Sequence, residues 1–575
     1  MASQDPPVRW CVLGQASGGR VEAIDLSEDA ASVTLTKDEF PRWIAEREAA
    51  GAPRWVWSDT AAWLPSLLAA GVRVERCHDL RLSHAILARS SMVRDRALLL
   101  EASEWDASAV TAAEAPTAPT LFEVEEHPAT ARSVPHGADA ALAEFARQRA
   151  AIATAESPAR LQLLLAAESA GALIASEMEA AGVPWDADEH DRLLQAALGP
   201  RPAAGDKPSR MIEVAIEVRE ALGDPRVSLD SAPKLLRSLR SAGVDVGSTS
   251  RWELAEHEHP VIEPLLRYKK LSRLFTANGW AWIDEWVRDG RYRPIYGPGG
   301  VVTGRWASSG GGALQLPRQL RAALRADPGW TLITADVAQL EPRVLAAMAG
   351  DRAMARAGSG TDLYVGVVAS GAVATRDEAK IAVLGAMYGA TTGDSGRLVP
   401  RLRRSFPAAM RLVDDAASVG EQGGVVSTWL GRSSPEPGPE WQELQARATL
   451  PSANAKDEDR ARRAAREFGR FTRNFVVQGT AAEWALAWLA ELRLRLWEIG
   501  PSDVAAPASG PVFEQRPHLV FFLHDEIIVH APQDLAEAVA AAVEAAAMTA
   551  GRRLFGEIPL DFPLDLRISE RSDKG

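Results

Sequence analysis

The pattern of hydrophobic and polar positions indicates a small α/β region at the start of the chain. Short apolar runs at residues 10–13, 21–24 and 55–57 alternate with helical stretches such as residues 60–70, a pattern typical of strands and helices in turn. Residues 106–136 are rich in Ala, Thr, Pro and Glu and lack periodicity. We therefore expect a linker or long loop there.

The middle of the chain, from about residue 140 to 290, has a helical pattern. Apolar residues recur at helical spacing from Leu161 to Met178, and Gly182 is placed to end that helix. Strands and long helices are mixed from residue 330 to 575. Within that region, the stretches 433–456 and 501–516 are expected to be irregular.

An aspartate stands at the end of the first strand predicted in this last region. Residues 331–335 form a short β-rich run, Asp336 follows, and a helical run over 343–348 begins after Pro342. Proline is well suited to the first turn of a helix. A carboxylate between a strand end and a helix start is a common way to present a metal ligand, although a solvated turn aspartate gives the same pattern.

A predicted hairpin carries a second acidic group. Two strongly apolar runs, 519–523 and 527–529, flank His524, Asp525 and Glu526, which predicts a turn with an acidic pair at its tip. Half-burying two carboxylates is unfavourable unless a cation or hydrogen bonds compensate. The hairpin is therefore a candidate cation site, with an ordinary acidic turn as the alternative.

A basic helix is predicted between these two acidic segments. Steps of four residues place Arg376, Lys380, Leu384 and Tyr388 along one slowly drifting face. This face could hold a triphosphate, a sugar and a base in succession, or it could be an ordinary amphipathic surface. Carboxylates at a strand end and a hairpin tip, with a basic helix between them, suit metal-assisted phosphoryl transfer.

Composition narrows the class of protein. The chain has 575 residues, of which 46% are hydrophobic and 25% charged, and a net charge of −13, as expected of a globular protein of several domains. The charge argues against non-specific binding of nucleic acid, but a basic groove can lie on an acidic body. There are 56 Arg and 8 Lys, so arginine is the default cation here and a single Arg carries little information.

Cysteine content and hydropathy bear on location. The two cysteines, Cys11 and Cys77, are too few for a disulfide framework and suit a reducing cytoplasm. No run of about 18 apolar residues free of charge is present, so we expect no membrane-spanning helix. The first residues lack the regions of a secretory signal.

Taken together, the motifs resemble those of the family A DNA polymerases, the family of the large fragment of bacterial DNA polymerase I. The run Asp336-Val-Ala-Gln-Leu-Glu341-Pro-Arg resembles its motif A, DYSQIELR. Arg376, Lys380, Leu384, Tyr388 and Gly389 resemble its motif B, RxxxKxxxFxxxYG, and His524-Asp525-Glu526 matches its motif C.

Two further segments strengthen the resemblance. Thr303-Gly304-Arg305, with Ser308-Ser309 and Leu314-Gln315, resembles the TGRxSSxxPNLQ pattern that precedes motif A. Residues 478–483 resemble QGTAAD, with Arg470 and Asn474 at the matching upstream spacing. The five elements stand in the family's order and cover roughly residues 160–570.

The resemblance implies a multidomain fold of the α/β and α+β classes. An RNase H-like, exonuclease-type amino-terminal domain would be followed by a right-hand polymerase with thumb, palm and fingers. The implied domains are residues 1–140 for the exonuclease-like domain and 141–575 for the polymerase domain. Within the latter, the implied regions are 141–295 for the thumb and the segment leading into it, 296–355 and 465–575 for most of the palm, and 356–464 for most of the fingers.

The resemblance also implies roles for individual residues. Asp336 and Asp525 would bind two Mg²⁺ ions and, with Glu526, form the catalytic carboxylates. The implied dNTP-binding residues are Arg376, Lys380, Leu384, Tyr388, Gln339 and Glu341, of which Glu341 matches the steric gate that excludes a ribose 2′-hydroxyl. The implied DNA-binding residues are Arg305, Arg470, Asn474, Gln478 and His524. The arginines at 460, 462, 463, 466, 470 and 473 would also give one helical face suited to a nucleic-acid backbone.

Several positions depart from the family pattern. Leu384 replaces an aromatic residue that packs on the incoming sugar, and Tyr364 stands where many relatives carry His. Ala338 and Pro342 differ from the usual motif A, and Gly310–Gly312 loosens the segment after Arg305. None of these changes removes an implied metal ligand, so catalysis remains the expectation while nucleotide selection is open.

The amino-terminal region resembles the family's 3′–5′ exonuclease domain, but without its nuclease residues. None of the nine Asp before residue 150 has Glu two positions later, and no Tyr precedes Tyr268. When residues 78–87 are aligned with the family's helix after the second exonuclease motif, Trp63 falls where that motif has Asp. A two-metal nuclease cannot work without its carboxylates, so we expect an inactive scaffold. The 5′ nuclease domain of longer relatives is also expected to be absent.

The leading hypothesis is template-directed DNA synthesis on primer-template DNA, by a monomer in the cytoplasm that associates with the nucleoid. A bifunctional polymerase and exonuclease, or a non-catalytic DNA-binding relic, are the alternatives. A zinc site at His257 and His259 lacks further ligands nearby.

Overall fold

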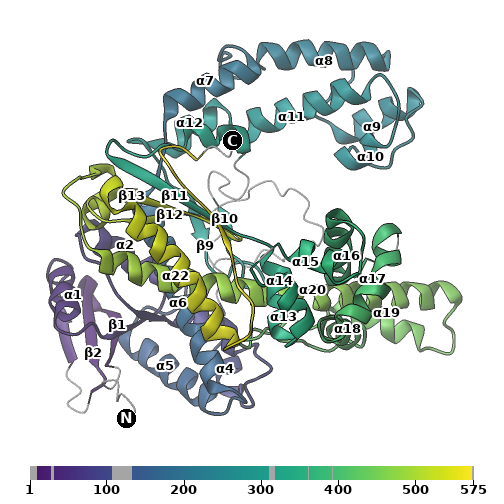
Figure 1. Ribbon diagram of the computed structural model, residues 1–575. Helices are drawn as coiled ribbons and strands as arrows, with labels where there is room; N and C mark the ends of the chain where they lie inside the picture. The colour runs from purple at the N-terminus through teal and green to yellow at the C-terminus, as the bar shows by residue number, and fades with distance from the viewer. Residues whose placement is uncertain are drawn as a thin grey trace. The chain divides into compact units, whose positions relative to one another are not determined.

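The protein is described here by a computed structural model, which covers residues 9–27, 32–106, 133–309, 317–360, 362–390 and 393–572 (Figure 1). The chain divides into two compact units. The first comprises Met1–Gly182, Ile295–Ser309 and Pro328–Ser569, and the second comprises Val183–Pro294, Gly310–Asp327 and Glu570–Gly575.

The amino-terminal part of the first unit is built around a mixed sheet. Its strands are β1 (Trp10–Ala16), β2 (Arg20–Asp25), β3 (Ser32–Leu35), β4 (Arg54–Trp57) and β5 (Cys77–Asp79), in the order β3-β2-β1-β4-β5. The pairs β1–β2 and β2–β3 are antiparallel, whereas β1–β4 and β4–β5 are parallel. The strands predicted at residues 10–13, 21–24 and 55–57 are therefore confirmed.

Helices cover this sheet. They are α1 (Glu39–Ala49), α2 (Thr60–Ala69), α3 (Leu80–Leu87), α4 (Ala97–Glu101) and α5 (Ala138–Ala153), and α2 confirms the helix predicted over 60–70. Both faces of the sheet are buried, because Trp55, Val56 and Trp57 are all fully inaccessible to solvent. Of the linker predicted at 106–136, residues 107–132 lie outside the described part of the chain.

Helix α6 (Pro158–Ala181) joins the amino-terminal sheet to the rest of the first unit. It ends at Gly182, whose φ of 69° suits glycine, as predicted. Leu173 and Ala181 of α6 pack in the same core as the aromatic residues of the amino-terminal sheet. Within the described residues, α6 is the one helix long and apolar enough to cross a membrane, but 72% of its apolar window is buried, which is typical of a core helix.

A second sheet forms the centre of the first unit. Its strands are β11 (Trp330–Val337), β12 (His518–Leu523), β13 (Glu526–Pro532) and β14 (Leu564–Ser569), paired antiparallel in the order β12-β13-β11-β14. Two long helices, α20 (Ala455–Ile499) and α22 (Ala536–Phe555), pack against each other and beside this sheet (Figure 1). The short strands β9 (Ile295–Gly297) and β10 (Ala307–Ser309) form a separate antiparallel pair. The strand predicted from residue 330 and the hairpin after residue 518 are confirmed.

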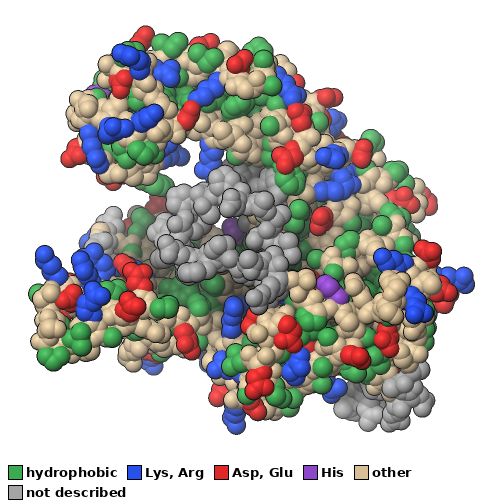
Figure 2. Space-filling view, turned by 180° about the vertical axis from the view of Figure 1, so that it is seen from behind, with side chains coloured by type: hydrophobic (Ala, Val, Ile, Leu, Met, Phe, Trp, Pro, Cys, Tyr) green, Lys and Arg blue, Asp and Glu red, His purple; other side chains and the backbone are tan. Residues whose placement is uncertain are grey.

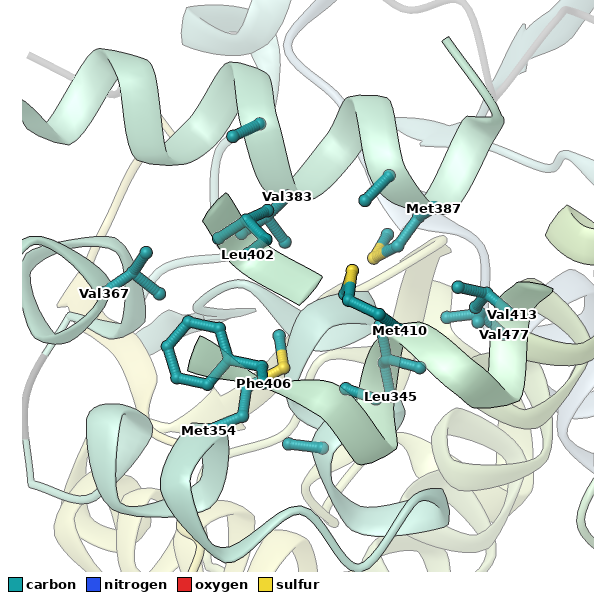
Figure 3. Packing of buried hydrophobic residues seen from close by; sticks show 14 of the residues in the cluster. Leu345, Met354, Val367, Val383, Met387, Leu402, Phe406, Met410, Val413 and Val477 are labelled. Atoms are coloured by element: carbon teal, nitrogen blue, oxygen red, sulfur yellow. The ribbon is translucent and has the colours of Figure 1, made fainter. Parts of the chain in front are cut away.

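A helical region lies between β11 and α20 in the sequence. Its helices are α13 (Leu340–Met348), α14 (Arg352–Gly358), α15 (Leu363–Ala369), α16 (Arg376–Tyr388), α17 (Gly393–Ser405), α18 (Pro407–Glu421) and α19 (Pro439–Ala448). Phe406, Met387 and Met410 lie at the centre of their shared core, which Val477 of α20 also enters (Figure 3).

The prediction of irregular structure at 433–456 is wrong in part, because α19 and the first two residues of α20 lie inside that range. Helix α19 is held by Trp441, whose ring contacts Phe468 of α20 at a centroid distance of 6.2 Å. The stretch 501–516 contains the 3-10 turn η5 (Pro507–Ser509) and one helical turn, α21 (Gly510–Phe513).

The second unit is largely helical. It contains α7 (Ala187–Leu198), α8 (Ser209–Leu222), α9 (Ala232–Ser241), α10 (Arg251–Ala255), α11 (Ile262–Asn278), α12 (Trp280–Trp286) and the 3-10 segment η4 (Arg318–Ala323). The short strands β6 (Val183–Pro184), β7 (Val287–Arg288) and β8 (Arg291–Tyr292) form its small sheet in the order β6-β8-β7. Its core is aliphatic, with Leu194, Leu198 and Leu265 fully buried. The sequence grouped residues 141–295 together, whereas in the structure residues 141–182 belong to the first unit.

Charged side chains of both signs cover the surface. Figure 2 shows Lys and Arg intermingled with Asp and Glu over the face in view. On that face the net charge of −13 is therefore not gathered into one acidic patch.

Candidate active site

The ladder of the second sheet brings the predicted catalytic carboxylates to one end of that sheet. Asp336 of β11 is paired directly with Glu526 of β13 on one side and with Asp565 of β14 on the other. Directly opposed residues in antiparallel strands point to the same face. The backbone N–H of Val337 donates to the carbonyl of Asp525 at 3.0 Å, which fixes the hairpin tip beside the end of β11.

The hairpin turn is tighter than the sequence suggested. Leu523 pairs with Glu526, so His524 and Asp525 alone form the turn, and His524 has a left-handed φ of 59°. Glu526 is consequently the first residue of β13 and is buried. The structure therefore places Asp525 at the tip and Glu526 within the ladder beside Asp336.

The electrostatics of the tip favour a cation. Burial, followed by the nearby charge of Asp336, raises the pKa of Asp525 to about 6, against the opposing influence of Arg305. Loss of water at the crowded tip, with the Arg305 charge, lowers the pKa of His524. A carboxylate whose proton affinity is raised by burial and by a neighbouring negative charge gains stability when a divalent ion replaces the proton.

The donor set fits Mg²⁺ rather than a metal enclosed by protein. Among the described residues, no group of three or more His, Cys, Asp or Glu side chains could enclose a metal ion. Mg²⁺ is commonly held by one or two carboxylates together with water and substrate phosphates. Asp336 and Asp525 are oxygen donors of this kind, so the residues present fit such an ion.

Glu341 is fixed through both of its carboxylate oxygens. Arg305 donates to Oε1 at 2.5 Å, and the Tyr388 hydroxyl donates to Oε2 at 2.7 Å. Burial and the Glu341 charge raise the pKa of Tyr388, which keeps its hydroxyl protonated as a donor. Three residues that the sequence placed in separate motifs therefore form one hydrogen-bonded group.

Arg305 is presented by a tight turn that the sequence placed before motif A. The N–H of Gly304 donates to the carbonyl of Val301 at 2.7 Å, and the N–H of Val301 donates to that of Arg305 at 3.1 Å. Gly304 has a φ of 83°, which suits glycine. The Gly310–Gly312 and Leu314-Gln315 parts of this motif lie outside the described residues.

Helix α16 presents the predicted basic face. It begins after Thr375, whose side chain accepts from the N–H of Glu378, and ends at Gly389, which is left-handed. Arg376 and Lys380 are exposed at its start, whereas Leu384 and Tyr388 are half-buried nearer its end. The predicted helix is confirmed, and its two cations lie at the exposed end while Leu384 and Tyr388 lie at the half-buried end.

Two residues near the site have a place that the sequence reasoning missed. Arg343 is fully buried and donates to the carbonyls of Ala338 at 2.8 Å and Asp561 at 2.8 Å. Asp362 accepts from Gln339 at 3.1 Å and from Arg376 at 2.8 Å. The position of Arg343 inside an apolar helical run could have indicated that it is buried. Nothing in the sequence spacing indicates that Asp362 bonds to Arg376.

The first residue of QGTAAE and the two polar positions upstream of it lie along α20. Arg470, Asn474 and Gln478 follow one another at helical steps of four, with Asn474 buried and the other two half-buried. Arg473 departs from the predicted basic face. It is buried, donates to the carbonyl of Ala386 at 2.5 Å and pairs with Asp414 at 2.7 Å, so it joins helices instead of facing solvent.

Among the described residues of the amino-terminal sheet, no comparable carboxylate pair lies where β1 ends. Gly14 of β1 lies against the backbone of residues 137–138, because an added Cβ would be 2.1 Å from the Ala138 nitrogen. The N–H of Gln15 donates to the carbonyl of His136 at 2.7 Å. Trp63, at the position matched to a nuclease aspartate, is buried and donates to Ser58 at 3.1 Å.

Part of this sequence is similar to that of known proteins. DNA polymerase I of Chloroflexus aurantiacus is 29% identical over 346 residues, which is 55% of this chain and 33% of that protein. The thermostable DNA polymerase I of Thermus aquaticus is 26% identical over 352 residues, covering 56% and 37%. The chain thus spans about a third of the length of the curated relatives it matches.

The fold is similar to a solved structure described as the POL domain of Pol1 from M. smegmatis in complex with DNA primer-template and dNTP. The TM-score is 0.68 over 99% of this chain and 96% of that chain, at 16% identity. Residues 237–570 also match the sequence profile of DNA polymerase family A. As that match covers more than half of the chain, this protein belongs to DNA polymerase family A.

Proposed function

We propose that the chain is a template-directed DNA polymerase that adds dNTPs to a primer 3′-hydroxyl. The observation that carries this proposal is the meeting of Asp336 and Asp525 at one end of the sheet, where burial and the nearby charge of Asp336 raise the pKa of Asp525. Family membership, and relatives named DNA polymerase I, support the same activity.

Asp336 and Asp525 are the residues that would hold two Mg²⁺ ions. When bound, such ions lower the pKa of an attacking hydroxyl and neutralise charge on the leaving pyrophosphate. Glu526, buried in the ladder beside Asp336, adds a third carboxylate to the catalytic set. Closely spaced negative charge of this kind attracts cations, and the bound cations can in turn bind phosphates.

The dNTP would lie along helix α16. Arg376 and Lys380, both exposed at its start, would bind the triphosphate and offset charge developing on the leaving group. Leu384 and Tyr388 would contact sugar and base farther along the same face. In this arrangement the triphosphate meets the solvated cations and the base meets the half-buried, less polar end.

Glu341 would act as the gate against ribonucleotides. Its two hydrogen bonds, from Arg305 and Tyr388, prevent the carboxylate from rotating away when a 2′-hydroxyl approaches. Gln339, left-handed at the start of α13, is the remaining residue of the proposed dNTP site. Leu384 offers a smaller apolar surface than an aromatic ring, so sugar selection would rest more heavily on Glu341.

Primer and template would be bound by residues that surround the terminal base pair. The proposed contacts are Arg305, Arg470, Asn474, Gln478 and His524. Their amide, guanidinium and imidazole groups suit the acceptors that every base pair presents in the minor groove. Recognition of this kind tests the shape of the pair without reading its sequence.

The amino-terminal sheet would be an exonuclease-like scaffold without nuclease activity. Its strand order, with an antiparallel half and a parallel half, supports the RNase H-like assignment. The backbone of residues 136–138 against Gly14 and the buried Trp63 leave no space for a carboxylate pair at those positions. Proofreading would therefore be absent.

The remaining assignments belong to the same proposal. The second unit would be the thumb, the second sheet the palm, and helices α14 to α19 the fingers. The protein would act as a monomer in the bacterial cytoplasm, associated with the nucleoid and with no membrane partner.

Extension of a labelled primer on a template, with Mg²⁺ and dNTPs, tests the activity. Wild-type protein should extend the primer, and Asp525→Asn should lose at least about a thousandfold in rate, because removing a ligand charge forfeits several kcal/mol of transition-state stabilisation. Absence of extension by the wild type would favour the non-catalytic DNA-binding alternative.

A second reaction tests proofreading. A primer with a 3′ mismatch, incubated with Mg²⁺ and without dNTPs, should keep its length. Shortening that persists in Asp525→Asn would identify a nuclease elsewhere in the chain and would establish the bifunctional alternative.

A further inference from the structure

Asp362 links three structural elements through one carboxylate. It is the N-cap of α15, where Oδ1 accepts from the N–H of Val365 at 3.1 Å. Its Oδ2 accepts from Gln339 Nε2 at 3.1 Å and from Arg376 Nη2 at 2.8 Å. The turn after β11, the start of α15 and the start of α16 therefore meet at this side chain.

The guanidinium of Arg376 is held in a defined plane. Its Nε also points to Asp362 Oδ2, at 3.3 Å, and its central carbon lies 5.6 Å from the centre of the Tyr364 ring. These contacts occupy one edge and one face of the group. A guanidinium has five N–H donors, and half of the Arg376 side-chain surface (51%) stays exposed, so its other donors remain open to a ligand.

Asp362 itself cannot move freely, because its partner Gln339 is fixed. Gln339 Oε1 accepts from the N–H of Leu363 at 3.2 Å and lies 3.4 Å from Nη2 of the fully buried Arg343. The Arg376 guanidinium is thereby tied, through two side chains, to the end of the strand that carries Asp336. An exposed arginine without such support samples many rotamers, and binding must pay for ordering it.

We propose that Asp362 is a positioning residue, which holds the Arg376 guanidinium in the orientation that receives the triphosphate of the incoming dNTP. The inference rests on the proposed polymerase function and adds a residue to it. Asp362 accepts from the Nε edge of Arg376 while the open N–H groups bind phosphate oxygens. Tyr364 supports the face of the guanidinium and adds no charge.

Asp362→Asn is the variant that isolates this role. Asparagine is as good an N-cap as aspartate, so the start of α15 is kept, but its NH₂ group cannot accept from Arg376. Steady-state extension should show the KM for dNTP raised about tenfold, the worth of one charged hydrogen bond. The kcat and the KM for primer-template should change much less.

Asp377→Asn is the matched control. Asp377 is exposed and adjacent to Arg376, so its substitution removes the same charge nearby without removing a bond to the guanidinium. The KM for dNTP should change by less than about twofold, as expected of an exposed charge. If the KM for dNTP rises equally in Asp377→Asn and Asp362→Asn, the effect comes from the loss of negative charge near Arg376 and not from a bond to it, and the proposal is overturned.

A double-mutant cycle separates positioning from a structural role. In an Arg376→Ala background, Asp362→Asn should add no further rise in the KM for dNTP, because the side chain that it positions is gone. The same fold-change in both backgrounds would overturn the proposal. A lower KM in Asp362→Asn would do so as well, since Asp362 would then compete with the triphosphate.

A binding measurement keeps this inference distinct from the polymerase activity. Calorimetry with inorganic tripolyphosphate should show weaker binding to Asp362→Asn and Arg376→Ala than to the wild type. If the wild type does not extend primers, the proposed function fails while this comparison still decides the role of Asp362. If the wild type extends primers normally, and Asp362→Asn has the same KM for dNTP and the same tripolyphosphate affinity as the wild type, the positioning role is refuted while the polymerase function stands.

Discussion

Asp79 of the amino-terminal sheet and Asp525 of the second sheet both have a raised pKa, but their surroundings give them different roles. Burial and a neighbouring aspartate raise the pKa of each to about 6. Asp79 is wholly buried, and its oxygens accept from the N–H and hydroxyl of Thr60 and from the N–H of Leu82. Asp525 lies half-buried at a hairpin tip beside Asp336.

The difference shows that a shifted pKa does not by itself identify a catalytic carboxylate. Asp79 is satisfied by donors of its own domain and holds the starts of α2 and α3 together. Asp525 keeps access to solvent, and the charge that perturbs it is one that a cation can relieve. The partners of a carboxylate, and the side on which it remains open, decide its role.

The largest effect on stability should come from removing Asp79. Asp79→Ala leaves the N–H groups of Thr60 and Leu82 buried without an acceptor, and should cost about 3 kcal/mol of unfolding free energy. Primer extension per folded molecule should be unchanged. Chemical denaturation measures the first quantity and an active-site titration the second, and lost activity in fully folded protein would break the comparison.

A smaller loss of stability should follow from placing a larger side chain near the end of β1. Gly14→Ala would place a Cβ 2.1 Å from the Ala138 nitrogen and should destabilise the protein by about 2 kcal/mol. Gly137→Ala is the matched control, since no atom of the described residues lies within 4 Å of its added Cβ. Thermal unfolding of the two variants should differ by several degrees. Equal melting temperatures would show that residues 136–138 can move away from β1.

The smallest expected effect on stability is a gain, and it comes from replacing Asp525. The fold raises the pKa of Asp525 from an ordinary 3.8 to about 6, so its ionised form destabilises the folded state above pH 6, and the cost vanishes below the ordinary pKa. Without Mg²⁺, Asp525→Asn should therefore be about 1–2 kcal/mol more stable than the wild type at pH 8. Melting curves from pH 8 to pH 4 should converge, and a constant difference would contradict the assigned cause.

Mg²⁺ provides a further check on the same pair of proteins. An ion that binds the folded wild type stabilises it by mass action, so added Mg²⁺ should raise the melting temperature of the wild type more than that of Asp525→Asn. An equal rise would place the stabilising ion away from the hairpin.

Local patterns predicted the parts of this structure that depend on local physics. The strand at 330–335, the hairpin around Asp525 and helix α16 follow from alternation, turn residues and capping. The resemblance to the family motifs implied the site residues Asp336, Glu341 and Arg376, and the ladder places Asp336 beside the hairpin, as the resemblance implied.

The parts that the sequence did not reveal depend on contacts between distant segments. Trp441 stabilises α19 by packing on Phe468, although the surrounding residues favour an irregular segment. Arg473 shares the spacing of its exposed neighbours, yet it is buried because it binds acceptors on α16 and α18. Asp362 and Arg376 are 14 residues apart, and only the folded chain shows their bond.

Helix α20 has a consequence for the stability of the chain. Its 45 residues span roughly 68 Å and carry Arg470 and Gln478 as well as Arg493. Arg493 is buried and donates to Glu177 at 2.6 Å and to the carbonyl of Glu75 at 2.7 Å. A chain without the amino-terminal sheet and its loops would keep Glu177, which lies on α6, but an N–H of this buried guanidinium would lose its acceptor at Glu75. The amino-terminal sheet would thus stabilise the remainder of the chain whether or not it has an activity of its own.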